Sequence, residues 1–78
     1  MPTALREGGF EIKINTDDHR PAHVHVWYQG ALSIITLEPA VTEREVYGNL
    51  SRAQRRRAVR LVSENRDYLL KKWNEVHG

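Results

Sequence analysis

The stretch AHVHVWYQGALSIITL, residues 22–37, decides how this chain folds. Branched and aromatic residues dominate it, which is typical of β-strands. Gln29 and Gly30 interrupt it as a two-residue turn of the kind that joins antiparallel strands. We therefore expect one strand over residues 22–28 and a second strand over residues 31–37, paired as a hairpin.

Alternation along the first of these strands assigns its two faces. Val24 and Val26 point to one side of the sheet, whereas His23, His25 and Trp27 point to the other side. The valine side is the natural partner for a helix, so we expect the histidine side to remain accessible. Its imidazoles, indole and aliphatic neighbours are too apolar to be simply solvated, so we expect a groove or a subunit contact there.

A second hairpin is expected near the N-terminus, where residues 8–9 are both glycine and suit a tight turn. The register of such a turn places Leu5 opposite Ile12 and Thr3 opposite Ile14. The strand that follows the turn alternates apolar and polar residues, so it should be half-buried.

The C-terminal half should be mainly helical. Residues 40–49 are charged and are expected to form a loop with at most one helical turn. Ser51 is the predicted N-cap, and a single helix should run from there to about Val76, with apolar residues at spacings of three and four. The residues expected to be buried together are Val24, Val26, Leu61, Val62 and Leu69.

These elements occur in the order ββββα. The predicted fold is α+β, a four-stranded antiparallel meander covered by one long C-terminal helix. With 78 residues, the chain should form a single domain over residues 1–78. It has no cysteine, which excludes disulfides and thiolate metal sites. No apolar run approaches the ~20 residues that span a bilayer, and the N-terminus has no signal-peptide core, so we expect a cytoplasmic protein.

Three of the four histidines, His19, His23 and His25, fall within seven residues. Strand alternation brings the last two together, and a bend in the preceding loop should bring the first toward them, with Asp17 or Asp18 near. Histidines so placed serve as general acids and bases, for example in phosphodiester cleavage, or as ligands of zinc or a similar ion. A third interpretation is a polar strand edge whose imidazoles only bond to the loop. We expect no cofactor and at most weak metal binding, because there is no thiolate and the carboxylates lie on a loop.

The start of the predicted helix reads SRAQRRRAVR, with five arginines in nine residues. Cations near a helix N-terminus oppose the macrodipole and repel one another, so helix stability alone does not favour them. We expect this surface to bind a nucleic-acid backbone or an acidic protein partner. The residues expected to make these contacts are Arg52, Arg55, Arg56, Arg60 and Trp27. The alternative is that Glu43 and Glu45 fold over the helix start and neutralise it.

Four motifs together carry a family resemblance. They are MPT-x-LR-x-GGF at the N-terminus, DH-x-P-x-HVHV before the third strand, LEP after the fourth strand, and LS…LV-x-EN…LL-x-x-WNE in the helix. Over residues 1–74 the chain resembles the small bacterial domain of unknown function 4160 family. The resemblance implies a small protein partner encoded by a neighbouring gene, and members of this family are suspected to be half of a toxin–antitoxin pair. It implies no established activity.

Three hypotheses about function follow from these observations. The first is a toxin–antitoxin-type module that binds or acts on nucleic acid, RNA in particular, with His19, His23 and His25 as its catalytic site. The second is a non-catalytic regulatory partner that forms a homodimer or a heteromer through the histidine and tryptophan face. The third is a metal-binding module built on the histidines. Whether the chain is an enzyme stays open at this point.

Overall fold

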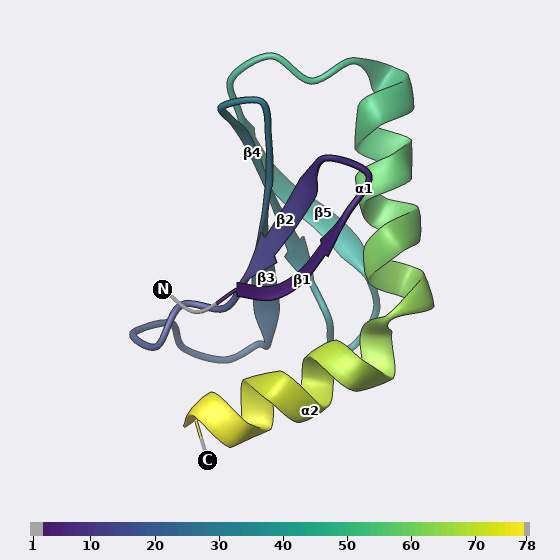
Figure 1. Ribbon diagram of the computed structural model, residues 1–78. Coiled ribbons are helices and arrows are strands. Elements are labelled where there is room, and N and C mark those ends of the chain that lie inside the picture. The colour runs from purple at the N-terminus through teal and green to yellow at the C-terminus, as the bar shows by residue number, and fades with distance from the viewer. Residues whose placement is uncertain (1–2, 78) are drawn as a thin grey trace.

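The computed structural model describes residues 3–77. A five-stranded antiparallel sheet with its strands in chain order is followed by two helices that meet at a corner (Figure 1). The strands are β1 (Thr3–Glu7), β2 (Phe10–Lys13), β3 (His23–Tyr28), β4 (Ala31–Thr36) and β5 (Thr42–Tyr47), and the helices are α1 (Arg52–Glu64) and α2 (Arg66–His77). The predicted α+β class with an antiparallel meander is confirmed, but the expectation of four strands and one helix is wrong.

The central hairpin of β3 and β4 has the predicted register. Val24 pairs with Ile35 across the two strands. Both turn residues have positive φ, 48° at Gln29 and 81° at Gly30, as a two-residue turn of this kind requires. In the first hairpin the register shifts near the start of β1, so that Thr3 pairs with Lys13 and not with Ile14 as we expected.

The segment that was expected to be a loop contains the edge strand β5. Its central residues are Glu43, Arg44 and Glu45, which have low intrinsic preference for strands. They form a strand because β4 offers an unpaired edge, and β5 pairs along most of its length. Charged side chains are common on edge strands, where they discourage pairing with another chain.

The long helix that we predicted is broken at Asn65, whose φ of −116° and ψ of 18° are not helical. The Asn65 side chain donates to the Leu61 carbonyl at 2.8 Å and so satisfies an acceptor at the end of α1. The Asn65 carbonyl accepts from the Leu69 N–H at 2.9 Å and starts α2. Beyond this point α2 does not project away from the sheet but crosses its end (Figure 1).

The start of α1 is the one that we predicted. The Ser51 side chain accepts from the Gln54 N–H at 3.1 Å, and the Gln54 side chain accepts from the Ser51 N–H at 2.8 Å. This reciprocal pair is a capping box, which satisfies two backbone donors that the helix leaves without partners.

The core lies between the valine side of the sheet and the two helices. The five residues that we expected to be buried together do belong to one cluster of buried side chains, which confirms the assignment of strand faces. Trp73 of α2 is fully buried and closes the end of this core. Neither helix within residues 3–77 has the length and apolar character needed to cross a membrane.

Candidate functional site

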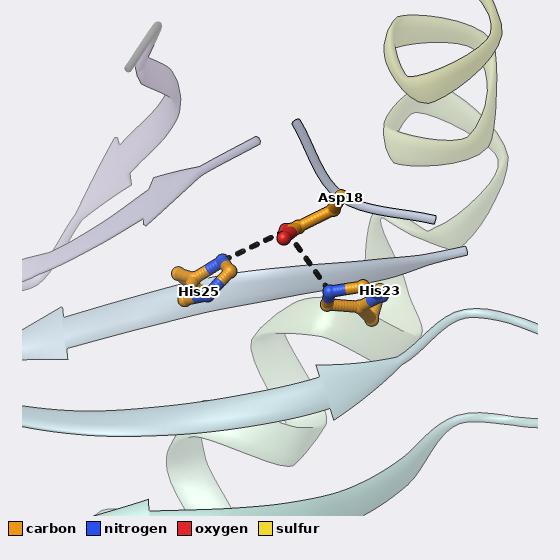
Figure 2. Close-up of side chains that lie close together, drawn as sticks. All are labelled: Asp18, His23 and His25. Carbon is orange, nitrogen blue, oxygen red and sulfur yellow. Dashed lines mark ion pairs between the residues drawn. The ribbon is translucent and has the colours of Figure 1, made fainter. Parts of the chain in front are cut away.

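The loop between β2 and β3 lies over the histidine side of β3 (Figure 2). The Asn15 side chain accepts from the Asp17 N–H at 3.2 Å, and the Asn15 carbonyl accepts from the Asp18 N–H at 3.3 Å. Asparagine stabilises tight turns through bonds of this kind. The turn directs the Asp18 carboxylate toward the strand below it.

Three side chains converge there, Asp18, His23 and His25, and we call them the Asp–His cluster. The Asp18 Oδ2 atom is 2.9 Å from His23 Nε2 and 3.6 Å from His25 Nδ1 (Figure 2). The two imidazole rings are 5.7 Å apart between centroids. They meet because residues two apart on a strand share a face.

His23 is buried, with only 5% of its surface exposed. Its Nδ1 atom donates to the Pro21 carbonyl at 2.9 Å, and its ring lies 5.3 Å from the ring of Trp73. We expected the histidine side to stay accessible, and for His23 this is wrong. The loop covers the ring from above, and α2 reaches it from the end of the sheet.

His25 is partly buried beside the same carboxylate. Burial lowers the pKa of the His25 imidazole below its ordinary value, while the charge of Asp18 opposes the shift. The charges of His23 and Arg44 add to the lowering. Because the main cause is loss of solvation, the neutral ring is favoured, and it keeps a lone pair on one nitrogen.

The other two residues proposed for the histidine side lie apart from the cluster. His19 is exposed on the loop and does not belong to the cluster. Among the described residues, the third member of the cluster is Asp18. Trp27 is partly buried between its strand neighbours Glu11 on β2 and Leu32 on β4. The structure therefore brings together two of the three predicted histidines, with a carboxylate as the third group.

The arginines form a second candidate site on α1. Arg52, Arg56 and Arg60 are exposed and follow one another at intervals of four, so they make a ridge along one side of the helix. We call these three residues the arginine ridge. A groove of about 500 Å³ is lined by this ridge together with Arg55, Val59 and Glu43.

Arg55 differs from the ridge because it is already paired. Its Nη2 and Nε atoms lie 2.6 Å and 2.9 Å from Glu43 Oε1. The second oxygen of Glu43 accepts from the Ser33 hydroxyl at 2.9 Å. The alternative that Glu43 and Glu45 neutralise the start of the helix therefore holds for one pair, Glu43 and Arg55. This pair also links β5 to α1.

His77 was not singled out from the sequence, yet it connects α2 to the loop over the cluster. Its ring stacks on Trp73 with 3.7 Å between centroids, and its two nitrogens lie 2.9 Å from the Trp73 carbonyl and 3.0 Å from the Asn15 carbonyl. The spacing of four between Trp73 and His77 was the available signal, because such residues are neighbours on a helix. The contact with Asn15 joins residues far apart in the sequence, and no sequence pattern predicts it.

Comparison with known proteins identifies a family. The model of the family described as Domain of unknown function (DUF4160) matches residues 9–74, which include the Asp–His cluster and the arginine ridge. No curated protein and no solved structure matches the chain. The match covers most of the sequence, and the chain therefore belongs to the family Domain of unknown function (DUF4160).

Proposed function

We propose that the protein is a cytoplasmic module of toxin–antitoxin type that binds the phosphate backbone of a nucleic acid, RNA in particular, through the arginine ridge. The observation that carries this proposal is the lack of charge compensation along the ridge. Among residues 3–77, no carboxylate forms an ion pair with Arg52, Arg56 or Arg60. Three unpaired cations on one line suit a polyanion better than they suit the helix.

The geometry of the ridge favours a backbone ligand. Residues four apart on a helix rise about 6 Å along its axis, which is close to the spacing of successive phosphates. The first turn of α1 contains no acidic residue, so its N–H groups add positive potential at the same end. Guanidinium groups can donate two parallel hydrogen bonds to one phosphate. The groove beside the ridge has an apolar surface at Val59, against which a sugar or base can pack.

The geometry favours binding over histidine-catalysed cleavage. His23 is buried and held by the Pro21 carbonyl, and His19 lies outside the cluster. A general acid or base must come within hydrogen-bonding reach of the substrate proton. We therefore assign RNA contact to α1 and expect labelled RNA to remain intact after incubation with the protein.

The proposal is tested with a mixed-sequence single-stranded RNA oligonucleotide and fluorescence anisotropy over a range of salt concentrations. Replacement of the arginine ridge by glutamine should abolish binding at moderate salt. A plot of the logarithm of the affinity against the logarithm of the salt concentration should be steeper for the parent protein than for the variant. The two slopes should differ by about 2, because each of three phosphate contacts on a single strand contributes about 0.7.

A charge-matched variant provides the control. Lys13, Lys71 and Lys72 lie outside α1, and their replacement by glutamine removes the same charge from the protein. That variant should keep most of its RNA affinity. Equal loss in the two triple variants, or unchanged binding in the ridge variant, would show that the ridge is not the RNA site. A ridge variant that binds RNA normally but loses a co-expressed neighbour protein would point to an acidic protein ligand.

A second candidate function is protein binding through the sheet face that carries Trp27. Leu32 of β4 pairs with Trp27 on one side and with Tyr47 of β5 on the other, and Tyr47 is 55% exposed. An exposed aromatic beside partly buried apolar residues suits a second copy or the small neighbouring protein. Light scattering after size-exclusion chromatography tests it, because Tyr47→Ser should weaken an assembly that uses this face and leave a monomer unchanged.

A further inference from the structure

The Asp–His cluster contains three potential ligand atoms that lie close together. His23 Nε2, His25 Nδ1 and Asp18 Oδ2 all lie within 4.8 Å of one another (Figure 2). The two histidines come from β3, and the carboxylate comes from the loop above it. This arrangement is independent of the arginine ridge and of any binding to RNA.

The tautomer of His23 follows from its hydrogen bond to the Pro21 carbonyl. His23 Nδ1 lies 2.9 Å from the Pro21 carbonyl oxygen, which can only accept, so Nδ1 carries the hydrogen. In the neutral ring, Nε2 is then without a hydrogen and presents its lone pair to Asp18. A backbone carbonyl that orients one ring nitrogen while the other faces an ion is the usual environment of a metal-binding histidine.

The other two atoms of the cluster lack partners of their own. Within residues 3–77, Asp18 Oδ2 and His25 Nδ1 are buried and have no hydrogen-bond partner. His23 Nε2 lies 2.9 Å from Asp18 Oδ2 without forming an aligned hydrogen bond, so it does not satisfy the carboxylate oxygen. Buried polar atoms are rarely left without a partner, so an unsatisfied pair of this kind indicates a place for a water molecule or an ion.

A single proton cannot serve all three atoms. If it lay between His23 and Asp18, it would satisfy that pair and leave His25 Nδ1, which is 3.6 Å from the same carboxylate oxygen, without a partner. A cation that accepts an electron pair from each of the three atoms satisfies the whole cluster. Burial of both imidazoles, whose side chains are only 6% and 13% exposed, would limit the access of bulk solvent to such an ion.

Two of the three separations between these atoms are close to those of ligands around one ion. With bonds of about 2.1 Å, neighbouring ligands lie about 3.0 Å apart in octahedral geometry and about 3.4 Å apart in tetrahedral geometry. The two distances from Asp18 Oδ2, 2.9 Å and 3.6 Å, bracket these values. The third separation, between His23 Nε2 and His25 Nδ1, is within 4.8 Å.

We propose that Asp18, His23 and His25 form a binding site for a divalent first-row transition-metal ion such as Zn²⁺. Two imidazoles and one carboxylate are the donors that such ions accept, whereas Mg²⁺ and Ca²⁺ prefer oxygen ligands throughout. Three protein ligands leave at least one coordination position for water or another ligand. We had expected weak metal binding at most, because the carboxylates lie on a loop. The structure changes that expectation, since the turn at Asn15 holds Asp18 over β3.

A bound ion would fasten the loop to the sheet. Residues 14–22 connect β2 to β3, and contacts from His77 to Asn15 and from His23 to Trp73 tie this region to α2. Metal binding should therefore stabilise the loop, β3 and α2 together. This effect can be measured without knowledge of any activity.

The experiment uses the untagged full chain after treatment with a chelator and dialysis. Titration with Co²⁺, which gives visible absorption bands in such sites, should saturate at one ion per chain at micromolar metal, and Zn²⁺ should displace it. Zn²⁺ should also raise the unfolding temperature, whereas Mg²⁺ should neither displace Co²⁺ nor stabilise the protein. Failure of the parent to take up one Co²⁺, or displacement by Mg²⁺, would overturn the proposal.

Three variants assign the ligands. His25→Ala and Asp18→Asn should each lower the affinity by more than about 100-fold, since loss of even an outer-shell partner costs about 10- to 100-fold. His19→Ala is the control, because this exposed histidine lies on the same loop outside the cluster. If His25→Ala fails to fold by circular dichroism, Asp18→Asn decides the question. Unchanged affinity in a folded ligand variant, or equal loss in His19→Ala, would refute the assignment.

Discussion

Removal of the arginine ridge should make the protein more stable, and the size of the effect can be worked out from α1. Arg52 is the first residue of the helix, where a positive charge opposes the macrodipole by about 0.3–1 kcal/mol. The pairs Arg52–Arg56 and Arg56–Arg60 each place like charges four residues apart, which costs about 0.2–0.5 kcal/mol per pair. Replacement of all three by glutamine, whose helix propensity is close to that of arginine, should therefore stabilise the fold by about 1 kcal/mol.

The assay is unfolding followed by circular dichroism, with heat or urea, at low and at high salt. A gain of 1 kcal/mol corresponds to about 4–8 °C in a domain of this size. The gain should shrink at about 1 M salt, where the Debye length is about 3 Å and repulsion between exposed charges is screened. Arg57→Gln is the matched control on the same helix. The Arg57 guanidinium lies 5.5 Å from the centroid of the Phe10 ring, so its loss should destabilise the protein slightly.

A result of the opposite sign would refute the reasoning. If the ridge variant unfolds several degrees below the parent at low salt, the three arginines make stabilising contacts in the folded protein. Their exposure without an ion-pair partner would then not indicate a binding surface. A gain that persists at high salt would show instead that the change acts through something other than charge.

Two further predictions concern the elements that the structure adds to the sequence analysis. Trp73→Ala should destabilise the protein by about 3–5 kcal/mol, because the fully buried indole closes the core beneath α2. Urea denaturation measures the loss of stability, and a loss below about 1 kcal/mol would show that α2 does not depend on this contact. His23→Val should cost about 0.5–1.5 kcal/mol in the metal-free protein, because it removes the hydrogen bond from the His23 ring to the Pro21 carbonyl. The accessible histidine side expected from strand alternation would instead leave stability unchanged, and a variant as stable as the parent would support that interpretation.

The arrangement of the central strands could be predicted because it depends on local chemistry. Val24 and Val26 alternate with His23 and His25, and a one-residue shift would expose the valines to water. The turn at residues 29–30 needs positive φ, which glycine adopts without strain. Both features are set by neighbouring residues, so the strand faces and the hairpin register followed from the sequence.

The break at Asn65 and the strand β5 did not follow from the sequence, for two different reasons. Buried positions such as Leu61 and Leu69 keep spacings of three and four on both sides of the break, so the pattern is the same whether the helix continues or turns. The turn is decided by the open end of the core, which Trp73 fills. The strand β5 is highly charged, and it exists because β4 provides backbone partners along its edge.

For the candidate sites, the sequence by itself determined that two histidines share a strand face and that three arginines share a helix side, because these relations depend only on the period of the element. Only the tertiary structure decided that Asp18, rather than His19, meets the two histidines. That choice depends on the turn at Asn15 and on the path of a loop whose contacts reach α2, more than fifty residues away in the sequence. Tertiary packing also decided which arginine is neutralised, because the pairing of β5 with β4 places Glu43 beside α1.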